Sequence, residues 1–150
     1  MIKNEDIVFI SDNHKKFYEE SLQKCRYDDE YHKALCYCLG ISADTRNHIE
    51  DIYDFKSGLV NPECITHGWQ TSGTLKVVRL AFNLYCNGTP TENLYKGKDL
   101  GTQLMEVKNY TVEDLFCCCY APFFWQAIKL RYPEYANYDT ELHKSLGSRD

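Results

Sequence analysis

The sequence predicts an all-α fold, a compact single domain of about six or seven helices, and three observations lead to this prediction. The chain has 150 residues, a length typical of one domain. Its 43% apolar and 26% charged residues are typical of a folded globular protein and exclude a disordered one. Apolar side chains recur every three or four residues along most of the chain. We expect one domain over residues 1–150, with its core at about 7–145 and a frayed C-terminal tail.

The N-terminal part begins with a short apolar segment, residues 7–10, which we interpret as a strand or as a packed lead-in. A helix is predicted over about residues 12–25, because Ser11 or Asp12 can accept hydrogen bonds from the free N–H groups at its start. The side chains of this helix that are expected to point inward are Tyr18, Leu22 and Cys25.

A second helix is predicted to begin at Asp28, Asp29 and Glu30, because acidic residues favour the positive end of the helix dipole. It is expected to end at Gly40, since glycine is common just after a helix. Its inward side chains are predicted to be Tyr31, Leu35, Cys38 and Leu39.

A third helix is predicted from Ser42, which can cap it, to about Asp54. Its apolar side is expected to comprise Thr45, Ile49, Ile52 and Tyr53. Pro62 then suits the first position of a short helical turn that ends at Ile65.

The central helix of the domain is predicted to begin at Thr71 or Ser72 and to end before Asn87. A helix that is apolar around most of its circumference usually lies in the middle of its domain, and this one carries two apolar stripes. The first stripe comprises Leu75, Val78, Phe82 and Tyr85, and the second comprises Val77, Ala81 and Leu84. The narrow polar stripe that remains comprises Ser72, Lys76, Arg79 and Asn83.

The rest of the chain is predicted to contain a surface loop over residues 87–101, rich in glycine, followed by two helices. Thr111 caps the first helix, and Pro122 begins the second, which ends at Pro133. The inward residues of this last helix are predicted to be Trp125, Ile128 and Tyr132.

No segment of the sequence predicts a membrane span or an export signal. No apolar run approaches the roughly 18–20 residues that a span needs, and the N-terminus lacks the basic and apolar regions of a signal peptide. We therefore expect a cytoplasmic protein without a membrane partner, whose eight cysteines are reduced thiols.

Negative charge is concentrated in the first three predicted helices. The formal net charge is −5, and residues 1–55 contain 12 acidic and 7 basic residues. This acidity argues against a non-specific nucleic-acid binder and favours a partner protein with a basic surface. The 12 tyrosines would add contact area to such an interface. The acidic residues predicted to contact the partner are Asp28, Asp29, Glu30, Glu50, Asp51 and Asp54.

Two pairs of residues have the spacing of metal ligands. His32 and Cys36 lie four residues apart on the second predicted helix, and Cys64 and His67 lie three residues apart. Together they would supply the four ligands of a closed structural zinc site. The alternative, which we favour, is that these cysteines are small buried hydrophobic residues and that no cofactor is bound.

A third group comprises Asp44, His48 and Asp51, whose spacing places them on one face of the third predicted helix. Two carboxylates beside a histidine raise its pKa or bind a metal. We favour the alternative of a solvated helix face with acids near its N-terminus.

The start of the central helix has the groups of an anion site. Thr71 and Ser72 supply hydroxyls, and Lys76 and Arg79 supply positive charge near a helix N-terminus. Such a site binds a phosphate or a nucleic-acid backbone. The interpretation we favour is a capped helix whose Arg79 pairs with an acid of the third helix, because no glycine-rich phosphate loop precedes this one. The acids expected to pair with it are Glu50 and Asp54.

Six short stretches carry a resemblance to a known family. They are residues 34–41 (ALCYCLGI), 44–46 (DTR), 52–54 (IYD), 69–72 (WQTS), 79–84 (RLAFNL) and 130–135 (LRYPEY). With these stretches, which span about residues 30–136, the chain resembles an uncharacterised family of small Firmicutes proteins found on phages, plasmids and conjugative elements. The resemblance implies an accessory protein of mobile DNA, and it transfers no catalytic residue.

The function we predict is a non-enzymatic accessory protein that binds a host protein. Small acidic proteins of mobile elements often act in this way, and the resemblance therefore implies an anti-CRISPR or other anti-defence inhibitor. The nucleic-acid channel of a CRISPR nuclease is basic and would suit an acidic partner. The alternatives are a nucleic-acid-binding regulator that uses the start of the central helix and a metal-dependent enzyme of unknown reaction.

Overall fold

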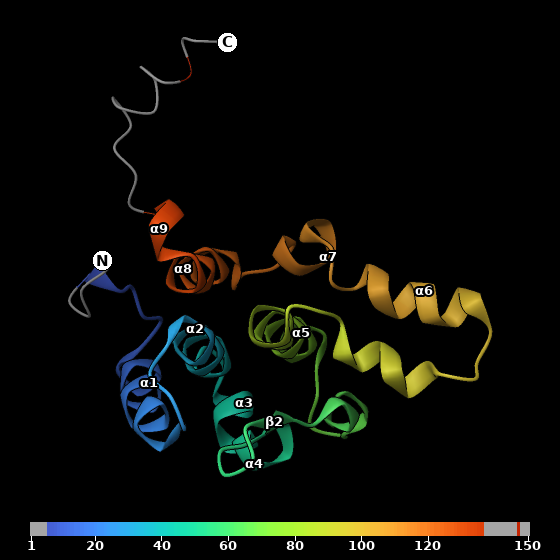
Figure 1. Cartoon of the computed structure of the whole chain (residues 1–150), viewed down its shortest axis with the longest axis horizontal. Helices are drawn as coiled ribbons and strands as arrows, with labels where there is room; N and C mark the ends of the chain where they lie inside the picture. Colours follow the sequence, from blue (N-terminus) through green and yellow to red (C-terminus); the bar gives the residue numbers. More distant parts are fainter. Residues whose placement is uncertain (1–5, 137–146, 148–150) are drawn as a thin grey trace.

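Helix α2 lies at the centre of the protein, with α1, α5 and α8 packed around it. We describe these elements from a computed structural model, which describes residues 6–136 and residue 147. The elements of this part of the chain, in order, are α1 (Asp12–Lys24), α2 (Glu30–Leu39), α3 (Ala43–Asn47), α4 (Ile49–Ile52), β1 (Tyr53–Asp54), β2 (Leu59–Val60), η2 (Pro62–Thr66), α5 (Ser72–Cys86), η3 (Pro90–Tyr95), α6 (Leu100–Lys108), α7 (Val112–Phe116), α8 (Ala121–Arg131) and α9 (Pro133–Ala136). In Figure 1, α8, α7 and α6 follow one side of the molecule, next to α2 and α5. The all-α prediction is confirmed.

The burial of α2 follows from its composition. Six consecutive side chains of this helix are at most 2% exposed, so it has no face toward solvent along this stretch. They are Ala34, Leu35, Cys36, Tyr37, Cys38 and Leu39. We predicted α5 as the central helix, and both apolar stripes of α5 are indeed largely buried. The centre of the domain is therefore a pair of helices, α2 and α5, rather than α5 alone.

The first two helix starts are confirmed. The Ser11 side chain accepts a hydrogen bond from the His14 N–H, and the Asp29 side chain accepts one from the His32 N–H. Helix α2 ends at Gly40 as predicted. Tyr31, which we expected to point inward, is 37% exposed, and its ring packs against Arg131 at the end of α8.

The N-terminal segment is a packed lead-in and not a strand. Ile7 is buried, and the Val8 N–H donates a hydrogen bond to Gln126 Oε1 at 3.1 Å. The Tyr37 hydroxyl donates to the Val8 carbonyl. The backbone of this segment is thus bonded to side chains of α2 and α8, which leaves it no strand partner. The predicted frayed tail, residues 146–150, lies outside the described residues except for residue 147.

The single third helix that we predicted over residues 42–54 is wrong. Helix α3 ends at Asn47, α4 adds one further turn after His48, and β1 then pairs antiparallel with β2, with Tyr53 opposite Val60. The Asp54 carboxylate accepts hydrogen bonds from the Lys56 N–H and the Ser57 hydroxyl. These bonds stabilise a turn in competition with a helix.

The second half of the chain also differs from the prediction. The expected loop over residues 87–101 contains η3 and the start of α6, whose N-terminus is capped by Asp99. Helix α8 buries a different stripe from the expected one, and Trp125 is 55% exposed. The buried residues of α8 are Phe124, Gln126, Ala127 and Leu130. Both stripes of α8 are apolar, and packing against α2 selects between them.

The structure also bears on the prediction that no segment spans a membrane. Within residues 6–136, no helix has the length and apolar character needed to cross a bilayer.

Candidate functional site

The most prominent candidate site is a surface of exposed tyrosines and acids around the start of α2 and the end of α8. Tyr27 is 62% exposed and Tyr135 is 72% exposed, values unusual for large aromatic side chains. We call this surface the aromatic–acidic surface. It comprises Tyr27, Asp28, Glu30, Tyr31, Tyr132 and Tyr135.

Arg131 at the end of α8 holds two of these tyrosines. Its guanidinium carbon lies 3.8 Å from the ring centroid of Tyr31 and 4.6 Å from that of Tyr132. The same guanidinium donates hydrogen bonds to the Leu84 carbonyl at 2.9 Å and to Asn87 Oδ1 at 3.0 Å. Since the arginine is fixed by α5, the rings stacked on it lose little further freedom when they bind a partner.

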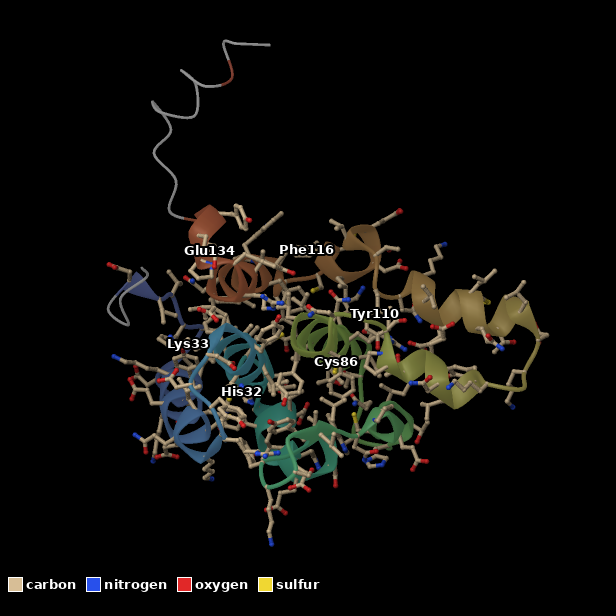
Figure 2. All side chains as sticks on the ribbon, in the orientation of Figure 1. His32, Lys33, Cys86, Tyr110, Phe116 and Glu134 are labelled. Atoms are coloured by element: carbon tan, nitrogen blue, oxygen red, sulfur yellow. The ribbon has the colours of Figure 1, made fainter. Side chains whose placement is uncertain are left out.

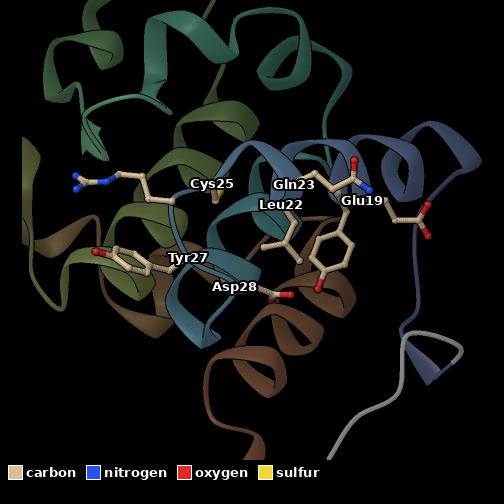
Figure 3. Close-up of a pocket in the computed structure, with 8 residues that line it drawn as sticks. Glu19, Leu22, Gln23, Cys25, Tyr27 and Asp28 are labelled. Atoms are coloured by element: carbon tan, nitrogen blue, oxygen red, sulfur yellow. The ribbon is translucent and has the colours of Figure 1, made fainter.

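A cavity of about 380 Å³ lies beside this surface, between the end of α1 and the start of α2. Figure 3 shows Leu22, Cys25 and Asp28 around it. Its full lining is Tyr18, Glu19, Leu22, Gln23, Cys25, Arg26, Tyr27 and Asp28. Two of these residues are acidic and one is basic, and the Arg26 guanidinium donates to the Ser57 carbonyl of the hairpin. The cavity therefore favours a cationic group.

Tyr18 lies in the wall of the cavity, and its hydroxyl is unusual. The residue is 1% exposed, and its hydroxyl has no hydrogen-bond partner among the described residues. Desolvation raises the pKa of Tyr18 well above its usual range, and the charges of Cys36, Asp28 and Glu19 raise it further. The hydroxyl thus stays neutral and is shielded from solvent.

The six acids predicted to contact a partner do not form one surface of free carboxylates. Asp28, Glu30 and Glu50 are exposed, and Asp28 lies 3.7 Å from the Lys33 ammonium. Figure 2 shows Lys33 on α2. Asp54 bonds to its own turn, as described above. Asp51 lies 3.4 Å from His48 Nδ1.

Asp29 binds His32 within the fold, although its side chain is 39% exposed. Its carboxylate accepts a hydrogen bond from the His32 N–H at 2.9 Å and lies 2.7 Å from His32 Nδ1. Desolvation raises the pKa of Asp29, but the hydrogen bonds from His32 lower it by more, so the pKa lies below its usual range. His32 in turn lies 3.5 Å from the Tyr85 hydroxyl, which donates to the Gly58 carbonyl. Asp29 therefore links α2 to α5 and the hairpin.

The four residues of the predicted zinc site each contact a different partner. His32 contacts Asp29, and the Cys36 Sγ lies 3.5 Å from the Cys25 Sγ. His67 Nδ1 lies 3.6 Å from the Asp51 carboxylate. The remaining member, Cys64, is buried beside Gln70. In the part of the chain that the structure describes, no three histidine, cysteine or acidic side chains are arranged to hold a metal ion.

The predicted face of Asp44, His48 and Asp51 is interrupted by the helix break at His48. The break turns the His48 ring onto Trp69, with a centroid distance of 4.5 Å and an interplanar angle of 2°. Asp51 then lies between His48 and His67. This arrangement depends on a contact across the turn, so helical spacing could not predict it.

Three residues of the predicted anion site, Thr71, Lys76 and Arg79, form hydrogen bonds within the protein. Thr71 and Thr74 exchange hydrogen bonds between their side chains and backbone N–H groups, and Ser72 is exposed. Lys76 donates to the Asp114 carbonyl. These contacts favour the capped-helix interpretation.

The partner of Arg79 is Glu106 of α6, and the expected pairing with Glu50 or Asp54 is wrong. The two hydrogen bonds from the guanidinium to the carboxylate are 2.8 and 2.9 Å long. Thr91 of η3 also donates to Glu106 and contacts Tyr110, which Figure 2 labels between α5 and α6. We expected a surface loop and no helix in this region, and so the sequence analysis offered no α6 acid as a partner.

Two features of the candidate site were missed by the sequence analysis. Arg131 was not singled out, because its role depends on contacts with α2 and α5 that lie far from it in sequence. Tyr18 was assigned only to the core, and the sequence has no signal that its hydroxyl would be left without a protein partner.

Comparison with known proteins places the chain in one family and gives no further relative. The model of a family described as a family of unknown function, DUF6075, matches residues 4–144. Neither the curated proteins nor the solved structures contain a significant match. The match covers most of the chain, and the protein therefore belongs to the DUF6075 family.

Proposed function

We propose that this protein is a non-enzymatic binding protein that docks its aromatic–acidic surface on a basic surface of another protein. The single observation that supports this most is the stack of Tyr31 and Tyr132 on the Arg131 guanidinium. It gives an exposed aromatic platform beside Asp28 and Glu30, held by hydrogen bonds to α5. Tyrosine on a rigid support provides much contact area at a low cost in conformational entropy.

Charge and shape in the same region are consistent with a basic partner. Asp28 and Glu30 would attract a positive surface during encounter. The cavity next to them has two carboxylates, from Glu19 and Asp28. A lysine or arginine side chain of the partner would fill this cavity and lie near these two carboxylates.

The partner we propose is a host defence protein in the cytoplasm, with a CRISPR nuclease as the leading candidate. The resemblance to proteins of phages, plasmids and conjugative elements supports this proposal, as does the net charge of −5. The protein would then act by covering the basic nucleic-acid channel of the nuclease. Direct binding of nucleic acid is less favoured, because Lys76 and Arg79 already have partners within the fold.

The experiment is capture and inhibition with two matched charge-reversal variants. Asp28→Lys with Glu30→Lys changes the aromatic–acidic surface, and Glu63→Lys with Glu113→Lys makes the same change in charge at exposed positions on η2 and α7. Asp29 is left intact, because it caps α2 and holds His32. Each tagged protein is incubated with the purified nuclease, and both binding and DNA cleavage are measured.

We expect the wild type and the control variant to bind and inhibit equally. The Asp28/Glu30 variant should lose on the order of tenfold in affinity, with a loss that shrinks at high salt. Equal binding by both variants would contradict the assignment of this surface. Failure of the wild type to bind the nuclease, together with capture of a DNA fragment at low salt, would replace the proposal by the nucleic-acid alternative.

A further inference from the structure

Two cysteine side chains meet at the junction of α1 and α2. Cys25 is the residue directly after α1, and its Sγ lies 3.5 Å from the Sγ of Cys36 in the middle of α2. A disulfide bond is about 2.05 Å long, so the sulfurs need to approach by roughly 1.5 Å. Among the hydrogen bonds of the described residues there is no other contact between two cysteine sulfurs.

The two thiols differ in access to solvent. Cys25 is half-buried and lines the 380 Å³ cavity, as Figure 3 shows, whereas Cys36 is 2% exposed. Residues 26–28, which follow Cys25, are exposed and lie outside any helix. A small oxidant reaches Cys25 through the cavity, and Cys36 is reached only through Cys25.

The hydrogen bond between the two sulfurs also distinguishes them. Donation from the Cys36 thiol lowers the pKa of Cys25, although desolvation and the charges of Asp28 and Asp29 act in the opposite direction. The same hydrogen bond and the burial of Cys36 raise the pKa of that thiol well above its usual range. Cys25 is therefore the sulfur with more thiolate character, which is the form that reacts with oxidants.

We propose that Cys25 and Cys36 form a reversible disulfide when the protein meets a peroxide. The Cys25 thiolate attacks one oxygen of hydrogen peroxide, the O–O bond breaks, and Cys25 becomes a sulfenic acid while hydroxide leaves and takes up a proton. The Cys36 sulfur then attacks the Cys25 sulfur, the S–O bond breaks, and the hydroxide that leaves takes the Cys36 proton. Two thiols are oxidised by two electrons, and one peroxide is reduced to two waters.

The cross-link would join the end of α1 to the centre of α2. It would fix the segment that carries Tyr27 and Asp28, and it would place a disulfide in the wall of the cavity. The reaction does not depend on what the aromatic–acidic surface binds. A dithiol is able to return the bond to the reduced state by exchange.

The test is disulfide mapping of the full-length reduced protein after treatment with hydrogen peroxide. Free thiols are blocked with N-ethylmaleimide, the protein is digested, and the peptides are identified by mass spectrometry before and after dithiothreitol. We expect one cross-linked peptide pair that joins Cys25 to Cys36, lighter than the two free thiols by two hydrogen atoms. Cys38 and Cys64 are both buried and should stay reduced. Both should therefore carry the N-ethylmaleimide label when the protein is unfolded in that reagent.

Two alanine variants two residues apart on α2 give matched controls. Cys36→Ala should abolish the cross-link and leave a Cys25 sulfenic acid that dimedone traps, whereas Cys38→Ala should keep the wild-type cross-link. If the wild-type map shows Cys25 and Cys36 still free while the exposed Cys86, Cys117 or Cys119 is oxidised, the proposal is overturned. The wild-type map decides the matter even if a variant fails to fold.

Discussion

The Arg79 guanidinium and the Glu106 carboxylate form a bidentate ion pair in the interior of the protein, with side chains only 12% and 4% exposed. This pair joins the long helix α5 to α6, a short helix whose Leu100, Leu104 and Met105 are all exposed. Because α6 buries so little apolar surface, the ion pair and its hydrogen bonds are the main contacts that hold it against α5.

The first prediction concerns the loss of one member of this pair. Arg79→Ala should lower the free energy of unfolding by about 3–5 kcal/mol, because it leaves Glu106 buried without a cation. The measurement is urea unfolding followed by circular dichroism. Lys16→Ala removes a lysine from an exposed pair, Lys16–Glu20 at 3.9 Å, and should cost less than about 1 kcal/mol. Similar losses in the two variants would contradict a structural role for Arg79.

The second prediction compares two buried tyrosines of the same core. The Tyr37 hydroxyl donates to the Val8 carbonyl, whereas the Tyr18 hydroxyl has no partner among the described residues. Tyr37→Phe should therefore lower the free energy of unfolding by about 1 kcal/mol, and Tyr18→Phe should leave it unchanged or raise it slightly. Thermal and chemical unfolding of both variants provide the comparison. A larger loss from Tyr18→Phe would show that its hydroxyl has a partner in solution.

The third prediction is a loss of stability at mildly acidic pH caused by His14. The pKa of this histidine is lowered from 6.5 to about 4 as the net result of three effects: burial lowers it most, the hydrogen bond to the Tyr37 carbonyl raises it, and the charge of Arg46 lowers it. At a pH between these two pKa values, the unfolded chain binds a proton at His14 that the folded chain does not bind. The contribution of His14 is therefore complete above pH 6.5 and is lost as the pH falls to 4, for a total of about 3 kcal/mol.

The variant that checks this prediction is His14→Gln. It should be less stable than the wild type at pH 7, because the Ile10 N–H and the Tyr37 carbonyl lose a partner, and its stability should fall less between pH 6.5 and 4. His48→Gln removes a partly exposed histidine and should keep the wild-type decline. An unchanged decline in His14→Gln would assign the acid sensitivity to another group.

The fourth prediction concerns the glycine at the end of α2. A Cβ atom at Gly40 would lie 2.7 Å from His14 Cδ2 and 2.9 Å from Phe17 Cδ1. Since both ring nitrogens of His14 are hydrogen-bonded, the ring is not free to move away. Gly40→Ala should therefore cost about 1–3 kcal/mol. At Gly68 a Cβ atom would meet nothing within 4 Å, so Gly68→Ala should stay within about 0.5 kcal/mol in the same unfolding assay.

The parts of the fold that the sequence predicted well are those with strong local signals. Ser11 and Thr71 cap the helices that they were predicted to cap, because a cap needs only its own N–H neighbours. The break at His48 was not predicted, and the stripe buried by α8 was predicted wrongly. The helix break depends on strand pairing in the hairpin, and the buried stripe of α8 depends on packing against α2.

The candidate site was predictable only in composition. The acids near α2 and the tyrosines in general were expected to contribute to an interface, and Asp28 and Glu30 are indeed exposed. The structural role of Asp29 was not expected, because a run of three acids gives no sign of which one will bind the histidine three residues along the helix. The stack on Arg131 joins residues 100 positions apart, which no periodicity reveals.

Arg131 also couples the stability of the domain to the shape of its exposed platform. The same guanidinium closes the last turn of α5, where Asn87 adopts a left-handed conformation with φ of 55°, and supports the rings of Tyr31 and Tyr132. A change at this position alters the thermodynamic stability of the domain and the shape of its exposed platform together. Evolution toward a new partner is therefore expected to leave Arg131 in place and to act on the neighbouring Tyr27, Glu30 and Tyr135, whose side chains are open to solvent.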